Sequence, residues 1–420
     1  MKKYYNELLE KAPNSKKNSL WYSIGMFTFS FSSILLLLVV TRMLGTSEAG
    51  IFSIGWAVCQ QMLTIGMFGT RNYQVADLNE KYNFNYYFYS KFCSVMIMLV
   101  GSFVYGKLLH LDGYKMLIAF LLTLLMSGEA FADVFAGFFQ QHERLEISGK
   151  SYFVRILCYD ILFIGALYFS NNLALAIIFA IFFSYIWLFF VDFQVIRHLR
   201  KELNKPKSKR MLQLFIECAP IFLSAFLTNY IINIPKNSIE LLLTNEIQSV
   251  YNVLFMPSAI ITLFTSFVLV PMYTTISKAW SINDRKGYFS IVKKVTFTVL
   301  GLTILVVFGG YFIGIPVLSL VYSIDLFPYK NEFILLLVAG GLNSFANVLV
   351  YLLIVAGKQK YLLYVYGIAA ILATIISTIL VSKFGIFGAA SLYCISISFV
   401  VISLLVILFS LLYKQKKFRE

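Results

Sequence analysis

Residues 19–43, SLWYSIGMFTFSFSSILLLLVVTRM, carry no charged side chain before Arg42. A helix of about 20 apolar residues crosses the roughly 30 Å hydrocarbon core of a bilayer, so this stretch predicts a transmembrane helix. It is longer than the apolar core of a signal peptide, and no small-residue cleavage site follows it. We therefore expect it to stay in the mature chain as the first span.

Similar stretches recur along the whole chain of 420 residues. The chain is 59% hydrophobic and 13% charged, with a mean hydropathy of +0.78, which excludes an ordinary soluble domain. Long continuous runs are typical of helices rather than of the short alternating strands of an outer-membrane barrel. The predicted fold is an all-α polytopic membrane protein with about 12 transmembrane helices. The expected spans are 19–43, 49–69, 84–107, 114–139, 151–170, 173–196, 212–240, 248–274, 291–320, 333–356, 361–382 and 386–413.

The basic residues gather in the loops between alternate spans. With the N-terminus inside and one crossing per span, 29 of the 35 Lys and Arg residues fall on the cytoplasmic side. Cytoplasmic loops of membrane proteins carry such an excess, so we expect both termini in the cytoplasm. Orientation thus accounts for the net charge of +15, and no basic face with interleaved aromatic residues predicts a nucleic-acid partner.

The densest basic run follows the sixth span and divides the chain near its midpoint. Residues 44–54, after span one, also show weak similarity to residues 243–253, after span seven. The two halves match in the same order and orientation, which predicts two six-helix lobes related by a parallel pseudo-two-fold repeat. The predicted domains are an N-terminal segment 1–18, an N-lobe 19–196, a basic cytoplasmic linker 197–211, a C-lobe 212–413 and a C-terminal tail 414–420.

Span seven carries Asn229, Asn233, Lys236 and Glu240 at spacings that place them on one helix face. Polar side chains inside a membrane usually face a cavity or a partner helix. Two interpretations are open for Lys236. Its ammonium group binds an anionic headgroup beside Asn229 and Asn233, or it snorkels to the outer surface and pairs with Glu240.

Span four carries two carboxylates, Glu129 and Asp133, on one face. They are candidates for coupling to a proton or to sodium, and the alternative is structural pairing with Arg155 or another residue of the same lobe. Arg71 and Arg155 lie near the cytoplasmic ends of their spans. Their guanidinium groups suit phosphate capture, or they serve as ordinary anchors under the positive-inside rule.

Arg42 lies on the outer side, against the charge bias, and is either a cavity cation or the partner of Glu48. The chain has no P-loop, no dinucleotide-binding turn and no nucleophile elbow. Its five cysteines and three histidines are scattered, without the spacing of a metal site. We therefore expect no enzyme activity, no cofactor and no metal.

Five short segments together resemble the Wzx-type polysaccharide flippases of the multidrug/oligosaccharidyl-lipid/polysaccharide exporter superfamily. In the seventh helix of that family a basic residue follows a proline, and Lys236 follows Pro235 here. The segments occur in the family's order and cover most of the first half and the start of the second. They are Arg42–Phe52, Phe68–Asp77, Glu129–Val134 with Gly137 and Gln140, Gly149–Ser151 with Arg155, and Asn233–Ile239.

The resemblance implies a flippase in a bacterial cytoplasmic membrane. Its substrate would be an undecaprenyl-pyrophosphate-linked oligosaccharide, moved to the outer leaflet for capsule, O-antigen or exopolysaccharide biosynthesis. The resemblance also implies a cationic cavity between two lobes, alternating access, contact with membrane lipid, and a polysaccharide polymerase and assembly proteins as candidate partners. Three alternatives stay open: a multidrug or cation antiporter of the same superfamily, a peptidoglycan lipid-precursor flippase, and a non-transporting scaffold.

Overall fold

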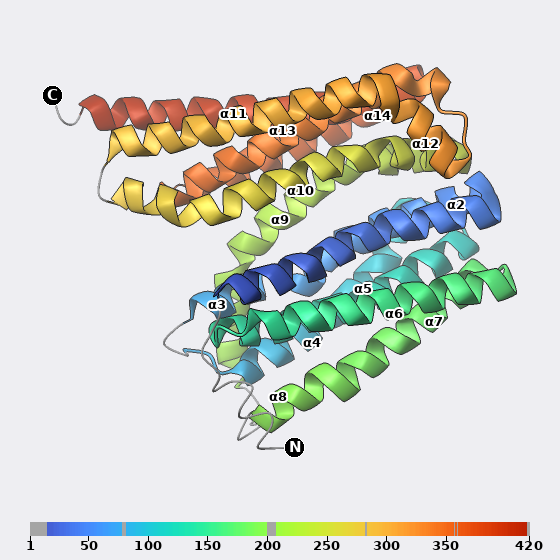
Figure 1. Ribbon diagram of the computed structural model, residues 1–420, viewed down its shortest axis with the longest axis horizontal. Coiled ribbons are helices and arrows are strands. Elements are labelled where there is room, and N and C mark those ends of the chain that lie inside the picture. Colours follow the sequence, from blue (N-terminus) through green and yellow to red (C-terminus); the bar gives the residue numbers. More distant parts are fainter. Residues whose placement is uncertain are drawn as a thin grey trace. The chain divides into compact units, whose positions relative to one another are not determined.

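The computed structural model describes residues 15–77, 81–199, 207–281, 284–356, 358 and 360–417 (Figure 1). Most of the expected N-terminal segment, part of the basic linker and the end of the C-terminal tail lie outside these residues. Within the described ranges the regular elements are all helical, which confirms the expected fold class. The chain divides into two compact units, Met1–Phe226 and Leu227–Glu420, and the division falls within α9 (Ser208–Leu242). The lobe boundaries expected from the sequence stay a prediction.

The first unit contains α9 up to Phe226 and the helices before it. These are α2 (Ser15–Met67), α3 (Thr70–Ala76), α4 (Phe84–Leu108), α5 (Gly113–Gln141), α6 (Leu145–Ser170), α7 (Leu173–Trp187), the π-helical turn η1 (Leu188–Asp192) and α8 (Phe193–Leu199).

The second unit contains the rest of α9 and the helices after it. These are α10 (Asn245–Ser281), α11 (Arg285–Gly309), the π-helical turn η2 (Gly310–Gly314), α12 (Ile315–Tyr322), the 3₁₀ turn η3 (Phe327–Tyr329), α13 (Lys330–Val355) and α14 (Lys360–Lys417). In this unit α13 packs against α10, α11 and α14.

Ten helical segments of the described chain are long and apolar enough to cross a membrane. Two of them are each interrupted by a glycine in the left-handed region, Gly45 (φ 87°) and Gly385 (φ 55°). Glycine adopts this conformation without the steric cost that a Cβ atom brings. Each glycine lies between two spans of one segment. The ten segments therefore contain twelve spans, which confirms the predicted number.

Polar residues at the helix ends separate neighbouring spans where the loop between them is short. Asn171 (φ 49°) ends α6, and the Asn172 side chain caps α7 by accepting a hydrogen bond from the Leu175 amide at 3.1 Å. Asp112 caps α5 in the same way, through the Lys115 amide at 2.8 Å. The helix that Asp112 starts is the most deeply buried span of the described chain, packed against α2, α4, α6 and α7. Polar side chains on α5 therefore lie in the centre of the first unit.

Candidate functional site

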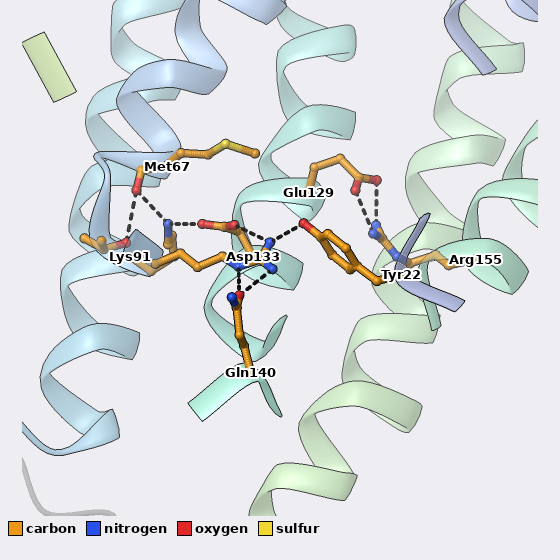
Figure 2. A network of polar contacts seen from close by, with 9 residues as sticks. Tyr22, Met67, Lys91, Glu129, Asp133, Gln140 and Arg155 are labelled. Atoms are coloured by element: carbon orange, nitrogen blue, oxygen red, sulfur yellow. Dashed lines mark hydrogen bonds and ion pairs between the residues drawn. The ribbon is translucent and has the colours of Figure 1, made fainter. Parts of the chain in front are cut away.

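Glu129 of α5 and Arg155 of α6 form a fully buried ion pair in the first unit (Figure 2). The Arg155 Nη1 and Nη2 atoms donate to the two Glu129 carboxylate oxygens at 2.8 and 2.7 Å, and Nη1 also donates to Ser184 Oγ at 3.1 Å. This two-bond geometry is the strongest that an arginine and a carboxylate can form. Of the two interpretations for Glu129, the pairing with Arg155 is the one that the structure shows.

Asp133 lies one turn further along α5 and contacts two basic residues (Figure 2). Its Oδ1 atom is 3.5 Å from Arg71 Nη1, and its Oδ2 atom is 3.3 Å from Lys91 Nζ. The Lys91 ammonium group also donates to the Met67 carbonyl oxygen at 2.9 Å, and its side chain is fully buried. Asp133 thus joins α3 and α4 to the centre of the unit.

The Arg71 guanidinium group has two further partners. It donates to the Tyr22 hydroxyl at 2.9 Å and to Gln140 Oε1 at 2.9 and 3.2 Å (Figure 2). Gln140 belongs to a segment that carried the family resemblance, so its contact with Arg71 gives that motif a physical role. Arg71 and the two Nη atoms of Arg155 donate to protein groups in this conformation.

A cavity of about 10 Å³ lies beside Arg155, large enough for about one water molecule. Its lining includes Ser148, Tyr152 and Asp192. Asp192 accepts a hydrogen bond from Ser151, which in turn accepts one from the Trp187 indole at 2.9 Å. The Arg155 Nε atom is buried without a hydrogen-bond partner among the described residues.

Asp160 is a further buried carboxylate of the first unit, with 3% of its surface exposed. Its Oδ1 atom accepts a hydrogen bond from Ser32 Oγ at 2.7 Å, which links α6 to α2. In the described part of the chain no lysine or arginine forms an ion pair with it. Asp160 therefore differs from Glu129 and Asp133, whose charges are both compensated.

In the second unit, Lys236 is buried and its Nζ atom lies 4.5 Å from the centre of the Phe255 ring on α10. This cation–π contact places the ammonium group inside the unit, unlike a lysine that snorkels to the surface. Asn233 on the same face is also buried, and Asn229 is half-buried. The structure therefore keeps these three residues together as a polar face of α9.

Arg42 is exposed, while Glu48 accepts a hydrogen bond from Tyr114 at 3.0 Å. Both interpretations of Arg42 remain predictions. The 29 residues counted as cytoplasmic include Lys91, and this was wrong because the Lys91 ammonium group is buried between helices. The signal was available, since a lysine inside the apolar span 84–107 is an intramembrane charge.

The turn before α4 ties the start of α9 to the first unit. Asp77 accepts hydrogen bonds from the backbone amides of Lys81 and Tyr82, both at 2.9 Å. Glu217 of α9 accepts from the Lys81 ammonium group at 2.6 Å and also from the Tyr73 and Tyr82 hydroxyls. The hydrogen bond to Glu217 raises the pKa of Lys81.

Known proteins resemble this chain in sequence family and in fold. A family model described as "Polysaccharide biosynthesis protein" matches residues 15–280. A search of curated protein sequences finds no match.

Among solved structures, the lipid II flippase MurJ in an inward closed conformation gives a TM-score of 0.69 at 15% identity, covering 93% of this chain and 87% of that one. The eukaryotic MATE transporter AtDTX14 gives 0.66 at 14% identity, covering 94% and 95%. An outward-facing MATE multidrug transporter of the MOP superfamily gives 0.61 at 13%, covering 98% of both chains. At these identities the likeness shows the fold, and it confirms the expected all-α polytopic membrane fold.

Proposed function

Because the chain belongs to the polysaccharide biosynthesis protein family, we propose that it is a flippase for lipid-linked oligosaccharides. It moves undecaprenyl-pyrophosphate-linked repeat units from the cytoplasmic to the outer leaflet by alternating access, and so supplies the biosynthesis of a surface polysaccharide. The observation that carries this proposal is the family match, which covers the first unit and continues into the second. The fold shared with a lipid II flippase supports it.

The paired carboxylates of the first unit favour an anionic substrate over an organic cation. A cation antiporter of the multidrug type needs a carboxylate that is open to its ligand or to the coupling ion. Glu129 is bonded to Arg155, and Asp133 lies between Arg71 and Lys91. Each charge is already compensated, so neither residue presents an open acidic site in this conformation. Either one would couple to a proton or sodium only after its partner moves.

Lys236 is the cation that we assign to the pyrophosphate, with Asn233 and Asn229 as hydrogen-bonding groups for the phosphate or the first sugar. Its ammonium group is buried in the second unit and lies over the Phe255 ring. Arg42 is a second candidate on the outer side. Arg71 and Arg155 would reach a phosphate only if Asp133 and Glu129 released them.

The protein has a multi-pass membrane location, and we place it in a bacterial cytoplasmic membrane with both termini in the cytoplasm. The charge bias of the loops supports this orientation. A polysaccharide polymerase and other assembly proteins are its candidate partners. In this proposal the chain transports its substrate without chemical change and needs no cofactor.

The test is to delete the gene and to extract undecaprenyl-linked oligosaccharides. We expect these intermediates to accumulate in the deletion strain, and we expect surface polysaccharide to disappear. Wild-type protein and Lys383→Ala should restore both, whereas Lys236→Ala at normal abundance should not. Lys383 is the matched control because it is an exposed lysine.

Other outcomes would identify the alternatives. Normal surface polysaccharide with new sensitivity to cationic drugs would support a multidrug transporter. Accumulation of peptidoglycan precursors with normal surface polysaccharide would support a lipid II flippase. Full rescue by Lys236→Ala would be consistent with a flippase but would show that Lys236 is not needed for transport.

A further inference from the structure

An aromatic groove of about 230 Å³ lies in the first unit, apart from the ion pairs. One leucine and six aromatic side chains line it: Phe88 of α4, Phe131 and Phe135 of α5, Tyr185 of α7, Phe189 of η1 and Phe193 of α8. The Phe88 ring centre is 6.2 Å from that of Phe135 and 6.0 Å from that of Phe193. The rings form continuous walls from three neighbouring segments.

The π-helical turn η1 shapes one wall of the groove. Such turns inside α-helices often occur at functional sites, because they redirect side chains at a cost in regular hydrogen bonding. Here the turn supplies Leu188 and Phe189 to the groove while Asp192 lines the small cavity beside Arg155. The five residues of η1 therefore contribute both to the apolar groove and to the polar cavity beside Arg155.

The groove is open to the surface of the first unit and offers no polar group to a ligand. The Phe189 side chain is 57% exposed and belongs to a helical segment that crosses the membrane. Tyr185 carries the one hydroxyl of the lining, and that hydroxyl is already bonded to Ser127. A sugar or phosphate bound here would lose its hydrogen bonds to water. The occupant must therefore be a hydrocarbon chain that enters from the bilayer.

Basic residues lie beyond one end of the groove. Arg197 is exposed and follows Phe193 by four residues on α8, so it lies on the same helix face about 6 Å further along. The Lys207 backbone amide contacts the Tyr86 hydroxyl at 3.3 Å, which brings the basic start of α9 to the first turn of α4. In the expected orientation this end faces the cytoplasm. An apolar groove with cations at its cytoplasmic end matches a hydrocarbon chain with an anionic headgroup.

We propose that the groove binds the polyprenyl chain of the lipid-linked substrate as it leaves the cytoplasmic leaflet, with the phosphate beside Arg197 and Lys207. This inference rests on the proposed function and adds the part of the substrate that the first unit recognises. The methyl branches of the isoprene units inside the groove pack against the ring faces. The straight acyl chains of a phospholipid offer these walls fewer contacts.

The test uses the full chain in nanodiscs of phosphatidylethanolamine and phosphatidylglycerol, with sugar-free undecaprenyl phosphate as the probe. Binding is titrated by native mass spectrometry for the wild type, Phe189→Ala and Phe190→Ala. We expect Phe189→Ala to weaken binding roughly fivefold. Phe190 is the matched control, because it is the neighbouring residue, is 65% exposed and does not line the groove. Its variant should bind like the wild type, and Arg197→Gln should weaken binding most at low salt.

Equal binding by Phe189→Ala and Phe190→Ala would overturn the inference. An affinity for phosphatidylglycerol equal to that for the probe, measured in nanodiscs of phosphatidylethanolamine alone, would overturn it as well, because the groove would then be an annular lipid site. Thermal unfolding of each purified variant shows whether it is folded. The probe carries no sugar, and the binding assay does not measure transport. A failure of the proposed function would therefore appear in the deletion strain and not in this binding assay.

Discussion

The residues that define the first unit's interior are charges that compensate each other across helices. Glu129 and Arg155 are both fully buried, and each satisfies the other through two hydrogen bonds. A buried ion pair adds little net stability, because both groups lose their hydration. Its effect is specificity, since neither residue can be buried without the other. The pair thus fixes α5 against α6.

Removing one member of this pair should therefore be costly. We expect Glu129→Gln to lower the free energy of unfolding by about 3 kcal/mol, because it leaves the Arg155 charge buried and uncompensated. The measurement is the apparent Tm of the purified protein in detergent. Glu143→Gln is the control, because Glu143 is exposed. The Glu143→Gln variant should unfold like the wild type. Equal Tm values for both variants would contradict the structural role of the pair.

Asp160 should behave in the opposite way. Its carboxylate is buried with a hydroxyl partner, Ser32, and without a basic partner in the described chain. Asparagine keeps an oxygen that accepts the Ser32 hydrogen bond and removes the cost of a buried charge. We expect Asp160→Asn to preserve or raise the apparent Tm, whereas Asp133→Asn should lower it by releasing Lys91 and Arg71. A similar loss in both variants would show that the Asp160 charge itself is needed.

The sequence predicted which residues carry intramembrane charge better than it predicted their partners. Glu129 and Asp133 were found because their spacing along one helix places them on one face. Their basic partners come from other helices, so helix packing decides the pairing. Arg155 was one expected partner, while Lys91 was overlooked because a charge near the end of a span resembles a loop charge. The burial of Lys236 argues against a lysine that snorkels to the surface, whereas its binding of a headgroup stays a prediction.

At the scale of elements, apolar runs were sufficient to locate the spans. A transmembrane helix needs only length and low polarity, and both can be read locally. The short gap between the expected spans 151–170 and 173–196 was also correct, because Asn171 and Asn172 end one helix and cap the next. The π-helical turns at Leu188–Asp192 and Gly310–Gly314 were not predicted. Such a turn depends on neighbouring helices rather than on a local signal.

Gly149 sets the distance between α2 and α6. A methyl group there would meet the backbone of Trp21 and Tyr22, and one on Gly25 would meet the Gly149 carbonyl oxygen at 2.6 Å. Small residues allow helices in membranes to approach this closely. We expect Gly149→Ala to cost about 1–3 kcal/mol of stability, measured as a lower apparent Tm.

Gly165 provides the control on the same helix, because a methyl group there would meet nothing within 4 Å. Gly165→Ala should leave the apparent Tm unchanged or raise it slightly, since alanine favours a helix by up to about 1 kcal/mol. If both substitutions had the same effect, helix propensity rather than the contact between α2 and α6 would explain it.

For the whole molecule, the distribution of basic residues predicts how the chain lies in the membrane. The excess of Lys and Arg in alternate loops predicts the orientation of every span at once, because each loop constrains its neighbours. This orientation also decides which leaflet the aromatic groove faces. If the termini were outside, the groove would open to the outer leaflet and could not receive a substrate made in the cytoplasm.

Two exposed serines that are expected on opposite sides of the membrane test this orientation. Ser47 lies in the turn after the first span, and Ser208 starts α9 after the basic linker. In a chain whose five cysteines are replaced, we expect Ser47→Cys to react with a membrane-impermeant maleimide in intact cells. Ser208→Cys should react only after the membrane is opened, because six crossings and the positive linker place it inside. The reverse pattern would invert the topology, and labelling of both in intact cells would mean that the chain does not hold one orientation.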